Sequence, residues 1–283
     1  MPYAAEPSPT GPPAPARVAF IDSGIGLLGY ADALLSLRPD LELVLALDPD
    51  HMPYGPRPHD EVRELVLALA RSAASYEPNA IVVACNTASV HGLEALREEF
   101  EPDDHIVGTV PAIRPAASTG GPVAIWSTAA TSTSDYLRGL IDAFASDIET
   151  HSIAALGLAE AIELADPDAI DRAIAEAVAV SPRDVSALVL GCTHYGLVAD
   201  RIADAWSRRR GADVTILDSP LAVARQTLRR IGLEPDEHAA PSAAAPTVLL
   251  SGRPSQLPER LAAYAPGAKL LGRPDPRRPT LTS

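Results

Sequence analysis

The stretch Ala80-Ile-Val-Val-Ala-Cys85-Asn-Thr-Ala-Ser89 contains the pattern on which the fold prediction rests. A short apolar run ends in a cysteine, and hydrogen-bonding residues that can begin a helix follow at once. The pattern occurs a second time at Ala187-Leu-Val-Leu-Gly-Cys192-Thr-His-Tyr-Gly196, and Cys85 and Cys192 are the two cysteines of the chain. A strand followed by a helix in each half of the sequence predicts two similar α/β units.

The apolar periodicity around these segments alternates between strand-like and helix-like runs. Strands are expected at residues 17–21, 41–47, 80–84, 106–110, 123–127, 148–153, 187–190, 214–217 and 247–250. Helices are expected up to residue 37 and at residues 61–74, 88–99, 134–145, 168–179, 197–208 and 257–264. Such alternation is typical of parallel sheets covered by helices on both faces. Val18-Ala-Phe-Ile-Asp-Ser23 also resembles Val214-Thr-Ile-Leu-Asp-Ser219, which we interpret as a second, weaker sequence similarity between the two halves of the chain.

The predicted fold class is therefore α/β, with two domains that each contain a largely parallel sheet flanked by helices. A first domain of residues 17–113 and 221–267 would carry Cys85, and a second domain of residues 114–220 would carry Cys192. The proline-rich residues 1–16 are expected to form a disordered lead-in, and residues 268–283 a loose tail. Open α/β sheets bind ligands at the carboxyl ends of their strands, so the expected site is a cleft between the domains.

Bulk composition disfavours several classes of function. A net charge of −14 argues against binding to nucleic acid or to anionic membranes, and local donors would have to hold an anionic substrate. No apolar stretch reaches the roughly 18 residues that a membrane-spanning helix needs. The sequence has no recognisable export signal, so the protein is expected in the cytoplasm, where thiols stay reduced.

Cys85 and Cys192 have two interpretations, one purely structural and one functional. Most free cysteines are buried small hydrophobes. Both thiols, however, are expected at the carboxyl end of a strand and beside a helix N-terminus, which lowers a thiol pKa and favours the reactive thiolate. Two thiols that face one cavity could remove a proton from one face of a carbon and return one on the other face. The pair therefore favours stereoinversion over a redox role, for which no Cys-x-x-Cys motif is present.

The polar residues near the cysteines could bind a ligand or serve only local structure. Asn86-Thr87 and Thr193-His194 suit helix capping, and free N–H groups at a helix start also form a cradle for carboxylates. His194 could tune the Cys192 thiol or share its proton, and the histidines show no spacing typical of a metal site. Asp22-Ser23-Gly24 and Pro53-Tyr54-Gly55 could be simple turns. Asp22 could instead pair with a substrate ammonium group or assist proton transfer.

Five motifs occur in the order found in glutamate racemases, which belong to the aspartate/glutamate racemase superfamily. They are Asp22-Ser23-Gly24, Pro53-Tyr54-Gly55, Ala84-Cys85-Asn86-Thr87-Ala88-Ser89, Val107-Gly108 with Val110-Pro111-Ala112-Ile113, and Gly191-Cys192-Thr193-His194-Tyr195. The resemblance extends from about residue 17 to residue 232, and more weakly to residue 265. It implies two α/β domains related by a pseudo-twofold axis, an active site between them, a homodimer, and catalysis with neither pyridoxal phosphate nor a metal.

The resemblance also implies roles for the matching residues. Cys85 would deprotonate D-glutamate and Cys192 would deprotonate L-glutamate, with the opposite thiol delivering the new proton. Asp22 and His194 look like the assisting acid/base groups. The implied substrate-binding set is Ser23, Pro53, Tyr54, Gly55, Asn86, Thr87, Thr131, Thr193 and Glu163. The D-glutamate produced would supply peptidoglycan synthesis.

Departures from the family pattern leave alternatives open. Leu27 stands where many members have a glycine, residues 49–52 are unusual, and Ala130 stands where a glycine often precedes the binding threonine. The alternatives are a racemase of another amino acid such as aspartate, a related lyase or decarboxylase, and a catalytically weak relative that binds an acidic ligand or a protein. One thiol suffices to protonate a single face of a carbon, so the second thiol disfavours the lyase.

Overall fold

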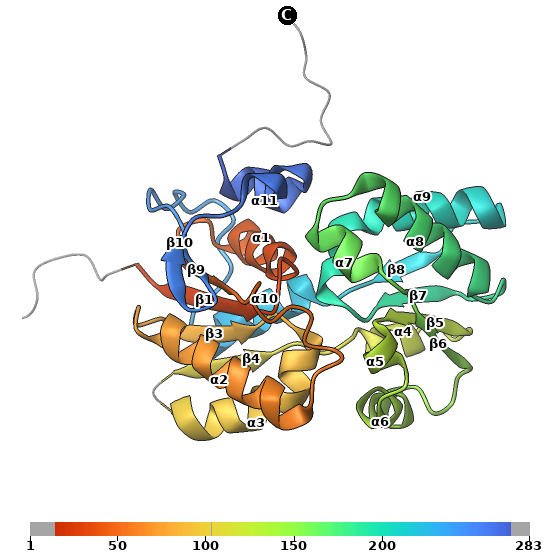
Figure 1. The fold of residues 1–283 in the computed structure, drawn as a ribbon, viewed down its shortest axis with the longest axis horizontal. Coiled ribbons are helices and arrows are strands. Elements are labelled where there is room, and N and C mark those ends of the chain that lie inside the picture. Colours follow the sequence, from red (N-terminus) through yellow and green to blue (C-terminus); the bar gives the residue numbers. More distant parts are fainter. Residues whose placement is uncertain (1–14, 103, 273–283) are drawn as a thin grey trace, which may run out of the picture.

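The computed structural model describes residues 15–102 and 104–272, whose strands form two sheets in two lobes (Figure 1). The first sheet has six strands in the spatial order β10 (Arg253–Ser255), β9 (Thr247–Leu250), β2 (Glu42–Leu47), β1 (Arg17–Asp22), β3 (Ala80–Val83) and β4 (His105–Gly108). The second has four strands in the order β6 (Thr150–Ala154), β5 (Val123–Ser127), β7 (Ala187–Leu190) and β8 (Thr215–Leu217). Adjacent strands are parallel except β9 and β10. The predicted α/β class is confirmed.

Helices cover both faces of each sheet, which explains why the strands are continuous apolar runs. In the first lobe the helices are α1 (Leu27–Leu37), α2 (His59–Ala74), α3 (Asn86–Phe100), α10 (Pro220–Arg230), the 3₁₀ helix η2 (Glu259–Ala263) and α11 (Ala265–Leu270). On β1, Ala19 and Ile21 pack under α2 and α3, whereas Val18 and Phe20 pack on the face covered by α1. Figure 1 shows these two layers on opposite sides of the sheet.

The second lobe repeats this layered arrangement. Its helices are α4 (Ile113–Ala117), α5 (Ala129–Ser132), α6 (Asp135–Phe144), α7 (Leu158–Glu163), α8 (Pro167–Val180), the 3₁₀ helix η1 (Thr193–Val198) and α9 (Ala199–Arg210). On β5, Ala124 and Trp126 pack toward α7, α8 and α9, while Val123 and Ile125 pack toward α4 and α6.

In residues 15–102 and 104–272, every helix is too short or too polar to cross a bilayer.

Strand order identifies which parts of the two lobes correspond. The order β2-β1-β3-β4 in the first sheet matches β6-β5-β7-β8 in the second. Cys85 therefore follows β3, and Cys192 follows its counterpart β7. The sequence similarity between residues 18–23 and 214–219 does not reflect a structural repeat, and that prediction is wrong. The strand β1 corresponds to β5, and β8 corresponds to β4. Short apolar strands resemble one another for reasons of burial alone.

In the C-terminal region the expected strand at 247–250 is confirmed as β9, whereas the expected helix and loose tail differ from the structure. The predicted helix at 257–264 is the short 3₁₀ helix η2, and α11 continues past residue 267 to Leu270, with Ala268 fully buried. The ordered chain therefore extends beyond the expected start of the tail. Residues 1–14 of the predicted lead-in and residues 273–283 of the tail lie outside the described residues, and the exact domain boundaries stay a prediction.

The helix α10 was missed although its sequence contains a helical signal. Pro220 stands at its first turn, and Val223, Ala224, Thr227 and Leu228 form a buried face with helical spacing. By contrast, α5 and α7 span about one turn each, which is too short for a periodic pattern.

Replacement of Ser181 by alanine tests the packing of the second lobe. The indole N–H of the fully buried Trp126 donates to Ser181 Oγ at 2.9 Å. The Ser181→Ala variant leaves this donor buried without its partner, so we expect a loss of about 1–3 kcal/mol of unfolding free energy in urea denaturation. The exposed Ser146→Ala variant should change stability by no more than about 0.5 kcal/mol. Equal stabilities of the two variants would contradict this account.

Candidate active site

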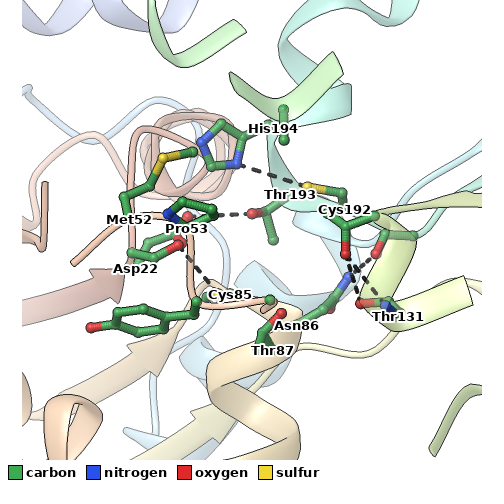
Figure 2. A pocket seen from close by; sticks show the side chains of 16 residues that line it. Asp22, Met52, Pro53, Cys85, Asn86, Thr87, Thr131, Cys192, Thr193 and His194 are labelled. Carbon is green, nitrogen blue, oxygen red and sulfur yellow. Dashed lines mark hydrogen bonds between the residues drawn. The ribbon is translucent and has the colours of Figure 1, made fainter. Parts of the chain in front are cut away.

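One pocket contains both thiols and is lined by residues from both lobes (Figure 2). The pocket lies where parallel strands of the two sheets end, which is the usual ligand site of open α/β sheets. Of the residues predicted for the site, the pocket lining includes Asp22, Ser23, Pro53, Tyr54, Gly55, Cys85, Asn86, Thr87, Thr131, Cys192, Thr193 and His194. Glu163, the remaining one, lies behind His194.

Cys85 occupies an acidic and buried corner of the pocket. Its Sγ lies 3.8 Å from Ser23 Oγ, and its thiol is hydrogen-bonded to the buried Asp22. Burial, followed by the negative charge of Asp22, raises the pKa of Cys85 well above its ordinary value. The expectation that the helix N-terminus lowers this pKa is therefore wrong, because the backbone N–H groups near the sulfur are outweighed. Cys85 is a thiol at neutral pH.

Asp22 is itself shifted by its surroundings. Burial raises the pKa of Asp22 to about 6, although the charge of His194 and the hydrogen bonds from Cys85 and the Gly24 backbone act in the opposite direction. A carboxyl group with this pKa can hold or release a proton near neutral pH, as an acid/base group requires.

Cys192 has a basic partner. Its Sγ lies 3.9 Å from Nδ1 of the buried His194 (Figure 2). Nε2 of the same ring lies 3.1 Å from Glu163 Oε2. Burial alone would lower the pKa of His194, but its hydrogen bonds to Cys192 and Glu163 raise it well above the ordinary value. His194 is thus an imidazolium at neutral pH, and it places a positive charge beside the Cys192 sulfur.

Glu163 holds His194 from the side away from the pocket. Its Oε2 accepts the backbone N–H of Ile25 at 2.9 Å, and Arg260 donates to Oε1 at 3.2 Å and to the Glu163 carbonyl at 3.0 Å. Burial alone would raise the pKa of Glu163, but the hydrogen bond and charge of His194, together with Arg260, keep it below the ordinary value. Glu163 therefore fixes the ring and its proton without lining the pocket.

Residues expected to cap helices instead bond across the cleft. Cys85 and Cys192 occupy the positions just before α3 and η1, and neither makes a side-chain capping bond. Asn86 Nδ2 donates to the Gly191 carbonyl at 2.8 Å, and Thr193 Oγ1 donates to Asp22 Oδ2 at 3.3 Å. These bonds join the two lobes beside the thiols.

Two glycines allow the lobes to approach this closely. A methyl group at Gly24 would collide with the side chains of Glu163 and His194. A methyl group at Gly26 would collide with Thr193 and lie 2.6 Å from Asp22 Oδ2. The glycine-rich turn after β1 therefore allows close contact with the second lobe. Leu27 does not enter the pocket, because its side chain is fully buried in the core under α1.

Several residues that line the pocket were not predicted from the sequence. Thr128 follows β5, accepts the backbone N–H of Thr131 and donates to Thr131 Oγ1 at 3.1 Å. A polar residue directly after a predicted parallel strand was a usable signal for Thr128. Met52, Ala159 and Gly191 also line the pocket, and Arg260 supports Glu163 from a distant segment that no local pattern marks.

Comparison with known proteins agrees with this geometry. The sequence model of the Asp/Glu/Hydantoin racemase family matches residues 31–227. Glutamate racemase of Pseudomonas entomophila (strain L48) is 35% identical over 222 residues, which cover 77% of this chain and 82% of that protein. Glutamate racemase of Escherichia coli O139:H28 is 36% identical over 251 residues, covering 84% and 80%.

Solved structures give the same result at the level of the fold. The crystal structure of Escherichia coli glutamate racemase in complex with L-glutamate and the activator UDP-MurNAc-ala superposes with a TM-score of 0.72 at 29% identity, covering 90% of this chain and 94% of that chain. A glutamate racemase isoform from Bacillus anthracis gives a TM-score of 0.64 at 27% identity, covering 78% and 84%. The chain therefore belongs to the Asp/Glu/Hydantoin racemase family, among its glutamate racemases, and is an amino-acid racemase, an isomerase.

Proposed function

We propose that the chain interconverts L- and D-glutamate without a cofactor, with Cys85 and Cys192 as the two bases. One observation carries the proposal: the two thiols follow corresponding strands of the two lobes, line one pocket, and have opposite electrostatic partners. The names of the similar proteins support glutamate as the substrate, as does the L-glutamate in the Escherichia coli structure.

The different surroundings of the thiols suggest how the reaction starts. With L-glutamate, the Cys192 thiolate beside the His194 imidazolium takes the α-proton. The S–H bond of Cys85 then breaks and its proton goes to the opposite face of the α-carbon. Cys192 ends as a thiol and Cys85 as a thiolate, which is the state that deprotonates D-glutamate in the reverse direction. Asp22 and His194 are the groups through which Cys85 would regain its proton and Cys192 would lose the one it has taken.

Hydrogen-bond donors in the pocket would stabilise the carbanion that forms between the two proton transfers. Removal of an α-proton without an electron sink needs donors arranged around the substrate carboxylate, in a site from which water is excluded. We assign this role to Ser23, Thr87 and Thr193. Asn86 Oδ1 is buried without a hydrogen-bond partner in the described part of the chain, so it suits the substrate ammonium group. Thr128, Thr131 and Gly55 would hold the second carboxylate.

The family resemblance also suggests the role of the reaction in the cell. D-glutamate from this reaction would supply peptidoglycan synthesis. The reaction needs two reduced thiols, which favours the cytoplasm. The homodimer stays a prediction from the resemblance.

Proton exchange in deuterated water tests the two-thiol mechanism. We expect the α-proton NMR signal of both L- and D-glutamate to disappear with the wild-type protein. The Cys85→Ser and Cys192→Ser variants should each lose about 10²- to 10⁴-fold in racemisation rate, the usual contribution of a positioned acid or base. Thr133→Ala, an exposed change next to α5, is the control and should keep the wild-type rate.

Each other outcome of this experiment has a distinct meaning. Exchange with the aspartates alone would keep the mechanism and replace the substrate. No exchange with any of the four amino acids, from folded and reduced protein, would reject the racemase mechanism and favour the ligand-binding alternative.

The pH dependence of activity tests the link between Glu163 and His194. The raised pKa of His194 keeps the imidazolium protonated at neutral pH, so activity should fall as pH rises through that pKa. Glu163→Gln removes one group that raises this pKa. The alkaline limb of kcat/KM should move to lower pH, and activity at pH 8.5 should fall by roughly 10-fold or more, since a hydrogen bond to a charged group is worth about 1.5–3 kcal/mol.

Glu160→Gln is the matched control for this experiment. It changes an exposed glutamate in the same helix, α7, and should leave the pH profile in place. An unchanged alkaline limb in the Glu163 variant would contradict the assignment.

Stability against pH tests the buried charge of Asp22. Its folded pKa of about 6 lies above the ordinary 3.8, so the unfolded state loses its proton first and the fold is destabilised as pH rises through this window. Asp22→Asn removes the charge. We expect its stability advantage over the wild type to grow by about 1–1.5 kcal/mol between pH 5 and pH 8 in urea denaturation, while activity is lost. The exposed Asp142→Asn variant is the control for the removal of a carboxylate that is not buried.

A further inference from the structure

The turn between β9 and β10 lies against the loop of residues 48–58, which connects β2 to α2 and forms one wall of the pocket. Ser251 begins this turn with a φ of +46°, and its backbone N–H donates to the Leu47 carbonyl at 2.7 Å. Its hydroxyl donates to Asp48 Oδ1 at 2.7 Å and accepts the backbone N–H of Asp50 at 3.2 Å. Ser251 therefore forms three hydrogen bonds, one to the last residue of β2 and two to the first residues of the loop, across about 200 positions of sequence.

Asp48 accepts several of the hydrogen bonds that hold this loop in place. It stands at the end of β2, is 3% exposed, and accepts from the Tyr54 hydroxyl at 2.7 Å and from His51 Nδ1 at 2.9 Å, in addition to Ser251. A buried carboxylate with three donors is well satisfied and fixes the position of each donor. Two of the donors, His51 and Tyr54, are residues of the loop itself.

The contact with Asp48 changes the role that Tyr54 can have. Tyr54 is 1% exposed and its hydroxyl is directed to Asp48, so the part of this residue that lines the pocket is not a free phenol group. What the loop brings to the pocket is the path of its chain through Met52, Pro53 and Gly55. The position of that chain relative to the thiols depends on where Asp48 holds Tyr54.

An ion pair reinforces the contact on the surface. Arg253 of β10 lies 2.6 Å from Asp50, and both side chains are about half exposed or more. Exposed pairs contribute little to stability, so the partly buried Ser251–Asp48 hydrogen bond is the stronger of the two contacts.

We infer that Ser251 is a positioning residue, which through Asp48 and Tyr54 sets the pocket wall formed by Met52–Gly55 for substrate binding. The inference rests on the proposed function, because it assigns the wall to the substrate of that reaction. Ser251 does not line the pocket. Its effect should therefore fall on substrate binding and leave the proton-transferring thiols unchanged.

The Ser251→Gly variant removes the hydroxyl group of Ser251 and keeps the backbone conformation of the turn. Glycine adopts a positive φ without steric cost, so the turn is kept and only the hydrogen bonds of the side chain are lost. We expect KM for both glutamate enantiomers to rise roughly threefold to tenfold, the range of one lost hydrogen bond, with kcat within about twofold of the wild type. Ser251→Asn should restore part of the KM, since asparagine tolerates this φ and its amide can donate to Asp48.

A double-mutant cycle separates positioning from general stability. Tyr54→Phe should raise KM in the same way, and Ser251→Gly should add little to it, because both changes break one chain of contacts. Ser255→Ala on the exposed strand β10 is the control and should match the wild type. A change in melting temperature with unchanged KM, or fully additive effects of the two changes, would overturn the inference.

The same measurements distinguish this inference from the proposed function. Wild-type turnover of glutamate with an unchanged KM in Ser251→Gly would remove the inference alone. If the wild type turns over only aspartate, the KM comparison is made with aspartate and decides the inference in the same way. A wild-type protein that turns over none of these amino acids would remove the proposed function and the inference with it.

Discussion

The close approach of the turn after β1 to the segment after β7 is the constraint on which the rest of the site depends. Gly24 and Gly26 leave room for Glu163, His194 and Thr193, which a side chain at either position would displace. Two hydrogen bonds use this proximity, from Thr193 to Asp22 and from the Ile25 backbone to Glu163. Because the contacts are short and buried, solvent screens the interaction between charges of different lobes only weakly.

The difference between the two thiols follows from this proximity. The lobes share one strand order, and the thiols follow corresponding strands. Their partners are opposite, however: Asp22 raises the pKa of Cys85, while His194, held by Glu163, places a positive charge beside Cys192. A symmetric framework thus places groups of opposite charge beside the two thiols. Such an arrangement suits two bases that act on opposite faces of one carbon.

Prediction from sequence succeeded where the signal was local. Strands buried on both faces are continuous apolar runs, so β1, β3, β5 and β7 were placed to within a residue or two, and the polar residues after β1, β3 and β7 were recognised as lining a pocket. It failed where long-range contacts decide. The pKa of Cys85 depends on burial and on Asp22 more than on its own helix. The supports Arg260 and Ser251 come from segments that carry no motif.

The sequence by itself determined the α/β class and the repeated strand–cysteine–helix unit, because these depend on residue type and spacing over about ten positions, and its resemblance to a known family indicated most of the other pocket residues. Only the tertiary structure decided which strands correspond, in which direction the pKa of Cys85 is shifted, and that the C-terminal segment contacts both sides of the site. The physical reason is that desolvation, charge–charge interaction and hydrogen-bond partnership depend on distance in space, which the fold sets for residues far apart in the chain.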